Sequence, residues 1–170
     1  MLSNIVLSQN AIVNSLYHQG AWDGLLPVNI REVAQNLGYM VVSINRELYP
    51  TSVGMAYSKD GLNYIGYYEC LGDFDQDSII GLELSRHLLG QVNADNDFMV
   101  LDDRKVLTAV DEETVAAKKM LFDFLMPDYA LHVLVERRGI SDITRLAKLL
   151  NVGENHLYEK LDKKYGMSKK

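Results

Sequence analysis

The chain has few of the features that stabilise proteins in oxidising compartments or anchor them in membranes. It contains a single cysteine, Cys70, among 170 residues, which excludes a disulfide framework and a zinc knuckle built from several cysteines. No apolar run approaches the roughly 18 residues of a membrane-spanning helix, and the start lacks the basic segment and apolar core of a signal peptide. We therefore expect a protein of the reduced cytoplasm that has no membrane partner.

Positive charge is also scarce over most of the chain. The 17 Lys and Arg residues oppose 23 Asp and Glu residues, and this balance argues against a protein whose whole surface binds nucleic acid. Residues 1–136 hold 8 basic and 19 acidic side chains (net −11), whereas residues 137–170 hold 9 and 4 (net +5). The length fits one domain with a small appendage. We expect the domain over residues 1–136 and a basic subdomain over residues 137–170.

The N-terminal half carries helix signals followed by strand signals. Apolar residues at helical spacing predict helices over residues 5–18 and 29–38. Residues rich in β-branched and aromatic side chains predict strands over 39–44, 53–57 and 62–68. The last two runs flank an Asp-Gly pair, which is typical of a tight hairpin turn. We expect a small, curled sheet of antiparallel type with helices packed against it.

The C-terminal half changes to helical periodicity. A strongly apolar helix is predicted from residue 73 to residue 90, and its composition indicates that it is central and buried. Residues 91–109 are polar and read as irregular. A helix opening with three acids is expected over 111–127, because acids favour the positive N-terminus of a helix. A final helical pair is predicted over 140–161, with a break near residues 151–153.

The central apolar helix carries the residues that suggest a function. Residues 80–90 read Ile-Gly-Leu-Glu-Leu-Ser-Arg-His-Leu-Leu-Gly. Further segments in a matching order are Pro27-Val28-Asn29-Ile30 to Leu37-Gly38-Tyr39, Val53-Gly54-Met55, Phe122-Asp123-Phe124-Leu125-Met126-Pro127, and Leu146-Ala147 to Val152. Together they resemble the ImmA/IrrE family of zinc-peptidase-like regulators over nearly the whole chain. The resemblance implies an α+β fold: a minimal zincin-like core with a small sheet and hairpin, a buried former metal helix, and a C-terminal helix-turn-helix-like subdomain.

The residues that would perform the family's chemistry are largely replaced. In that family the central helix carries the sequence His-Glu-Leu-Gly-His. When this chain is aligned with that pattern, Glu83 occupies the position of the catalytic glutamate, while Leu82 and Arg86 replace the two metal-binding histidines. The third ligand, a glutamate of the following helix, corresponds to Ala116. Leucine and alanine have no lone pair to donate, and arginine repels a cation. Without a metal, Glu83 has no acidified water to deprotonate. The resemblance therefore implies a catalytically inactive protein without a cofactor, in which Glu83 forms an ion pair with Arg86.

One alternative retains a metal. A register shifted by one residue aligns Glu83 and His87 as an i, i+4 pair, and Glu112 or Glu113 then supplies a further oxygen ligand for an atypical zinc metallopeptidase. The shift places Leu84 where the general base would stand, so the filled site would still lack its base. A simpler interpretation of His87 is a ring that packs or hydrogen-bonds beside the former cleft.

The resemblance still implies that the protein recognises a partner protein without cleaving it. Family members relieve repression by cleaving or antagonising a helix-turn-helix repressor, often one encoded by a phage or mobile element. The predicted partner-binding cleft is formed by one helix face and a flanking strand, with these residues: Leu82, Glu83, Arg86, His87 and Tyr64. A sheet edge at 62–68 could accept an extended peptide as an added strand. The net charge of −11 over residues 1–136 suits a basic DNA-binding partner.

A second alternative is a DNA-binding regulator that acts through residues 140–164. The helical pair fits a helix-turn-helix pattern, which would place its second helix in a major groove. The predicted DNA-facing residues are Arg145, Lys148, Asn155, His156 and Lys160. However, the positive excess is modest, and the family carries this helix pair as part of its fold.

Two other patterns receive structural interpretations. Three histidines, His18, His132 and His156, are expected to be surface or half-buried rings without a partner three or four residues on. The aspartates at 95, 97, 102 and 103 lack the glycine and final glutamate of a calcium-binding loop, so they predict a solvated connection.

Overall fold

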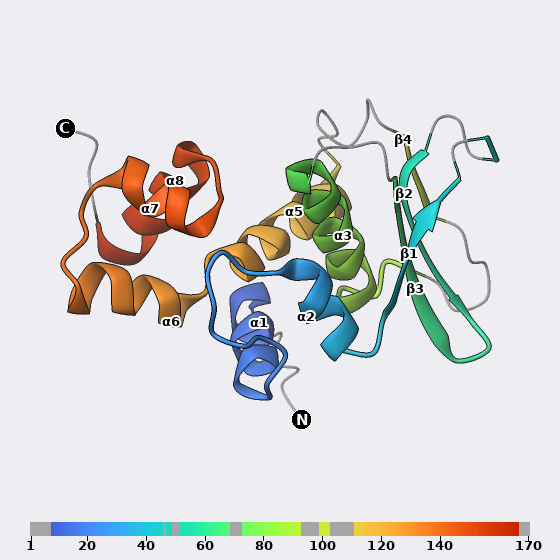
Figure 1. Ribbon diagram of the computed structural model, residues 1–170, viewed down its shortest axis with the longest axis horizontal. Helices are drawn as coiled ribbons and strands as arrows, with labels where there is room; N and C mark the ends of the chain where they lie inside the picture. The colour runs from blue at the N-terminus through green and yellow to red at the C-terminus, as the bar shows by residue number, and fades with distance from the viewer. Residues whose placement is uncertain are drawn as a thin grey trace, which may run out of the picture.

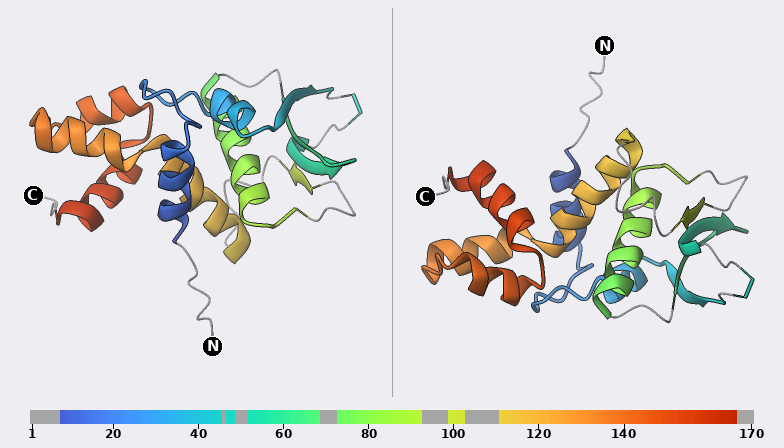
Figure 2. Two further views of the ribbon diagram at one scale, coloured as in Figure 1. Left: turned by 90° about the horizontal axis from the view of Figure 1, so that it is seen from below. Right: turned by 90° about the horizontal axis from the view of Figure 1, so that it is seen from above.

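The computed structural model has an α+β fold in which helices cover one side of a small sheet (Figure 1). It describes residues 8–45, 47–48, 52–68, 73–92, 99–102 and 111–166. All views place the sheet at one end of the molecule and α6, α7 and α8 at the other end (Figure 2). This arrangement confirms the predicted α+β class. Cys70 lies outside the described residues, as do the aspartates at 95, 97 and 103.

The described residues form a sheet of four strands in the order β1-β3-β2-β4. Their bounds are β1 Met40–Ile44, β2 Ser52–Lys59, β3 Leu62–Tyr68 and β4 Met99–Asp102. The hairpin of β2 and β3 turns at Asp60 and Gly61, whose φ angles are 52° and 77°. The Asp-Gly signal predicts this geometry, because glycine adopts positive φ without a steric penalty.

Two features of the sheet differ from the expectation. β1 runs parallel to β3, so the sheet is mixed and not of antiparallel type. The strand β4 lies inside residues 91–109, which the sequence predicts to be irregular. It pairs antiparallel with β2. A strand of four residues is too short to show an alternation of apolar and polar side chains, so only its pairing with β2 defines it as a strand.

Four of the described helices, α1, α2, α5 and α7, begin at side chains that accept backbone hydrogen bonds. Side chains of Ser8, Asn29, Asp111 and Asp142 each accept a bond from a backbone N–H of the first turn, which stabilises a helix start. The bounds are α1 Gln9–His18, α2 Ile30–Asn36, α3 Asp73–Leu88, α5 Glu112–Leu125, α6 Asp128–Leu131, η1 His132–Arg137, α7 Ile143–Leu150 and α8 Glu154–Tyr165; η1 is a π-helix. None of the described helices is both long and apolar enough to cross a bilayer.

The helix α3 occupies the centre of the molecule, as its composition predicts. Ile80 and Leu84 are fully buried, and α3 contacts α2, α5, β2 and β3. Two glycines permit this close packing. A Cβ at Gly54 of β2 would overlap Ile79, and one at Gly81 of α3 would overlap Leu121 of α5. The helix is therefore wedged between the sheet and α5.

Apolar packing divides the chain earlier than the predicted boundary at residue 136. One buried cluster joins the sheet to α1, α2, α3 and α5, and a second begins at Met126 and continues through α8. Three half-buried residues, Trp22, Leu26 and Val152, pack against both clusters. The C-terminal helices therefore share packing with the body, and α6 and η1 belong to their cluster.

Candidate functional site

The carboxyl group of Glu83 is buried between α3 and the sheet. The residue is 0% exposed, and neither carboxyl oxygen has a hydrogen-bond partner among the described residues. Its Oε1 lies 3.4 Å from the position a Cβ on Gly54 would take. Burial raises the pKa of Glu83 to about 8, and the positive charge of Arg86 offsets only part of this effect. At neutral pH the carboxyl group is therefore mostly protonated.

The guanidinium of Arg86 connects α3 to the start of α5. The residue is 4% exposed, and its Nη2 donates to Thr114 Oγ1 at 3.2 Å. The backbone N–H of Thr114 in turn donates to Asp111 Oδ1 at 2.8 Å. Hydrogen bonds from Thr114 lower the pKa of Asp111, and the charge of Arg86 adds to this effect. Arg86 donates a hydrogen bond to neither oxygen of Glu83, although its positive charge acts on that carboxyl group. The predicted ion pair between the two residues is therefore a charge interaction without a hydrogen bond.

The imidazole of His87 packs against the sheet. Its Nε2 lies 3.0 Å from the carbonyl oxygen of Tyr64, and its ring centroid is 5.0 Å from that of Tyr39. Burial lowers the pKa of His87, and the contact with Tyr64 only partly opposes this. The ring is therefore neutral at physiological pH, with Nε2 carrying the hydrogen that it donates. This agrees with the simpler interpretation of His87.

The described residues do not assemble a set of metal ligands. They contain no group of three or more His, Cys, Asp and Glu side chains placed to hold an ion. Glu112 and Glu113 are exposed on the first turn of α5 and do not converge with His87. Of the positions aligned with metal ligands, Leu82 is 2% exposed in the core, and Ala116 is half-buried on α5.

The predicted partner-binding cleft is buried at three of its five residues, which corrects the expectation for that part; His87 and Tyr64 are half-buried. Leu82, Glu83 and Arg86 are buried. Gly54 faces α3 and pairs with Tyr67, so the alternation of side chains along β3 turns Tyr64 to the opposite face. β3 is also paired on both sides, by β1 and β2, and cannot accept an added strand. Among the described strands, the outer edges belong to β1 and β4.

The predicted DNA-facing residues have different environments. Arg145, Lys148 and Asn155 are exposed. The ring of His156 stacks on Phe122 of α5, with centroids 3.9 Å apart. Lys160 points inward: its Nζ lies 3.0 Å from Asp123 Oδ1 and 3.9 Å from Asp128 Oδ1. The outward direction predicted for Lys160 is therefore wrong, because its side chain helps to dock α8 on the rest of the molecule. His156 is exposed as predicted, while its ring also packs on Phe122.

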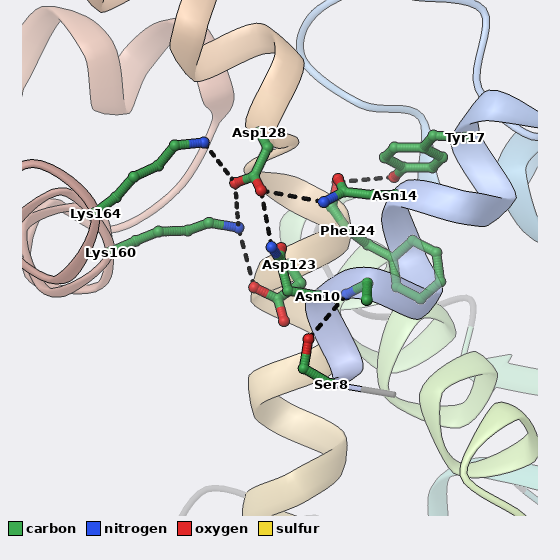
Figure 3. Close-up of polar contacts among 10 residues, drawn as sticks. Ser8, Asn10, Asn14, Tyr17, Asp123, Phe124, Asp128, Lys160 and Lys164 are labelled. Carbon is green, nitrogen blue, oxygen red and sulfur yellow. Dashed lines mark hydrogen bonds and ion pairs between the residues drawn. The ribbon is translucent and has the colours of Figure 1, made fainter. Parts of the chain in front are cut away.

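A polar network that the sequence analysis did not predict fixes this docking. Figure 3 shows lysines of α8 and asparagines of α1 converging on Asp128. Lys164 Nζ lies 3.0 Å from Asp128 Oδ1, while Asn10 and Asn14 donate to Oδ2 at 2.8 and 3.1 Å. Burial opposes ionisation of Asp128, but these hydrogen bonds and the charge of Lys160 outweigh it and lower the pKa to about 2.

His132 also differs from its prediction. Its Nδ1 lies 2.9 Å from Glu136 Oε2, and its Nε2 accepts a bond from Arg137 Nε at 3.3 Å. The ring therefore has a partner four residues on. The spacing of His132 and Glu136 was visible in the sequence, but only the helical conformation of this segment brings the two side chains together.

Comparison of the chain with models of known protein families and with curated proteins found no match. The resemblance to the ImmA/IrrE family therefore stays a prediction from sequence motifs. The geometry of α3 and its neighbours is the observation from which a function can be proposed.

Proposed function

We propose that this protein is a non-catalytic relative of the ImmA/IrrE zinc-peptidase-like regulators, with a zincin-like core and a helix-turn-helix-like C-terminal end. It acts in the cytoplasm by binding a helix-turn-helix repressor of a phage or mobile element, which it antagonises without cleaving. The observation that carries this proposal is the state of Glu83, which is 0% exposed. A general base must reach the water or substrate proton that it removes, and the described residues enclose this carboxyl group.

The environment of Arg86 supports the same proposal. In a zinc peptidase the metal joins ligands from different helices, and it stabilises the fold as well as performing the chemistry. In this chain the guanidinium of Arg86 joins α3 to Thr114 of α5. A hydrogen bond between two side chains of this chain thus links the helices that a metal ion would link in a zinc peptidase. The fold can then persist without a bound ion.

The charge distribution supports a basic partner. Residues 1–136 carry a net charge of −11, and DNA-binding domains carry clustered positive charge. An acidic protein can compete with DNA for such a domain, and the attraction weakens as salt screens the charges. The partner surface lies outside the buried face of α3, because that face has no access to solvent.

The test uses the purified chain and a helix-turn-helix regulator encoded beside its gene. We expect the chain to form a complex with the regulator and to release it from operator DNA, with the mass of the regulator unchanged when zinc is present. The variant Glu83→Gln should antagonise as well as the wild type. The complex should weaken as the salt concentration rises.

Two results would contradict the proposal. Zinc-dependent fragments of the regulator that disappear with Glu83→Gln would establish an active metallopeptidase. Failure of the chain to bind or release the regulator would remove repressor antagonism. Salt-dependent binding of the chain alone to duplex DNA, lost when Arg145 and Lys148 are replaced by Gln, would favour a DNA-binding regulator.

A further inference from the structure

A groove of about 640 Å³ lies where the two apolar clusters meet. It is bordered by the end of α1, the segment that follows α1, the start of α6, the π-helix η1 and the last turn of α8. Its volume lies within the range of about 300–1,000 Å³ that is typical of small-ligand sites. The groove is separate from the buried face of α3.

Aromatic rings form part of the groove wall. Trp22 and Tyr17 contact each other with ring centroids 5.2 Å apart. Hydrogen bonds hold both rings, since Trp22 Nε1 donates to Leu25 O at 2.9 Å and the Tyr17 hydroxyl donates to Phe124 O at 2.8 Å. Tyr129 also lines the groove and is 62% exposed. Aromatic faces carry negative electrostatic potential and attract cations.

The charged residues of the groove favour the same kind of ligand. Among the described residues, Asp23, Asp128 and Glu136 line it together with one lysine, Lys164, so carboxylates outnumber lysine and arginine side chains in this lining. Asp128 and Lys164 neutralise each other at 3.0 Å. The carboxylates of Asp23 and Glu136 therefore provide the excess negative charge.

The positions of these two carboxylates are set by local contacts. Asp23 Oδ1 accepts the backbone N–H of Leu25 at 2.8 Å, which fixes the side chain in a turn. Glu136 lies on η1, where it contacts His132, and its side chain is 45% exposed. Both carboxylates thus border the groove in defined positions while retaining access to solvent.

We propose that the groove binds an organic cation, an alkylammonium or guanidinium group carried on an apolar stem. Asp23 and Glu136 attract the charged end, and the rings of Trp22 and Tyr129 contact the stem. This proposal does not rest on the proposed function. The cation can belong to a free amine or to an Arg or Lys side chain of a basic polypeptide, and the chemistry of recognition is the same.

Binding can be measured from the fluorescence of Trp22, because this is the only tryptophan of the chain and it lines the groove. The probes are agmatine as a free amine, a short peptide with a central arginine, and the same peptide with neutral citrulline in place of arginine. We expect a saturable fluorescence change with the cationic probes and none with the citrulline peptide. Response to agmatine alone identifies a free amine as the source, and response to the arginine peptide alone identifies a polypeptide.

Substitutions of opposite sign test the role of charge. Asp23→Asn and Glu136→Gln should each weaken binding of the cation by about two- to fivefold, the range for exposed charge pairs. Lys164→Gln, which keeps a donor for Asp128 but removes a positive charge from the groove, should tighten binding. Glu159→Gln removes an exposed acid of α8 that does not line the groove, and it should leave binding unchanged. Unfolding curves of all variants verify that the fold is intact.

Three results would overturn the proposal. These are no response of Trp22 to any cationic probe in the folded protein, an equal response to the citrulline peptide, and equal weakening by Glu159→Gln and Glu136→Gln. None of these results bears on repressor antagonism, which is measured with a different partner. The two proposals can therefore fail separately.

Discussion

Glu83 of α3 is buried and Asp128 at the start of α6 is half-buried, and their pKa values move in opposite directions. Burial raises the pKa of Glu83 to about 8, whereas hydrogen bonds and nearby lysines overcome burial and lower that of Asp128 to about 2. The two sites differ in their donors. Asn10, Asn14 and Lys164 reach Asp128, while no described residue donates to Glu83.

This difference indicates what each region contributes. A carboxylate that accepts several hydrogen bonds stabilises the fold in its charged form, whereas a buried carboxyl group that accepts none stays protonated and neutral. Asp128 therefore works as a structural anchor between α1, α6 and α8. Glu83 adds no charged contact to the fold, and its retention is not explained by stability.

The largest expected effect comes from replacing Glu83. The pKa of Glu83 lies above that of the unfolded chain, so the folded state binds an extra proton and stability falls as the pH rises from about 4.5 to about 8. Glu83→Gln removes this titration. Its unfolding free energy should match the wild type below that window and exceed it at alkaline pH by an amount on the order of 4 kcal/mol. Denaturant unfolding across pH measures this, and a parallel pH profile for both proteins would contradict the assignment.

A smaller effect of opposite sign is expected at Asp128. Asp128→Ala leaves two lysines and two asparagines without their shared acceptor, and should destabilise the fold at pH 7 by about 2 kcal/mol. The pKa of Asp128 is depressed, so its ionic stabilisation is present above about pH 4 and disappears as the pH falls toward about 2. The difference from the wild type should shrink over that interval. A difference that is constant with pH would indicate lost packing alone.

An intermediate effect on stability is expected when the hydrogen bond that links α3 to α5 is removed. Thr114→Val keeps the backbone bond to Asp111 but removes the hydroxyl that accepts from Arg86. Loss of one acceptor for a buried donor should destabilise the fold by about 1–3 kcal/mol. Thr114→Ser, which retains the hydroxyl, is the matched control. A loss of stability for Thr114→Ser with none for Thr114→Val would show that the methyl group and not the hydrogen bond matters.

The smallest effects should appear at the exposed cations of α7. Arg145→Gln and Lys148→Gln should each change the unfolding free energy by less than about 0.5 kcal/mol, as exposed charges do. Lys160→Gln removes a cation held 3.0 Å from Asp123, and should cost about 1–2 kcal/mol. Thermal unfolding of the three variants tests this ranking. Similar losses at all three positions would contradict the inward placement of Lys160.

Local sequence patterns predicted much of the architecture. The hairpin at Asp60-Gly61, the burial of α3 and the start of α5 at Asp111 follow from turn chemistry, hydrophobicity and capping, which are properties of neighbouring residues. The strand β4 and the parallel pairing of β1 with β3 were not predictable in this way. They depend on pairing between distant segments, which leaves no local period in the sequence.

The site was harder to predict than the fold. The sequence resemblance predicts that Leu82 and Arg86 stand at metal-ligand positions, but the solvent access of Glu83 depends on how α3 packs against Gly54. The network at Asp128 joins residues more than a hundred positions apart. Lys160 was predicted to face outward because its periodic position is compatible with a helix surface. That surface is covered by α5 and α6, which only the tertiary structure reveals.

The shared packing of Trp22, Leu26 and Val152 has a practical consequence for anyone dissecting this protein. A chain truncated after residue 136 would keep Met126, Leu131 and Leu134 but lose the apolar side chains of α7 and α8 that cover them. The truncated product would expose a large apolar surface to solvent and is expected to aggregate during expression. Deletion experiments should therefore keep residues 126–165 with the body.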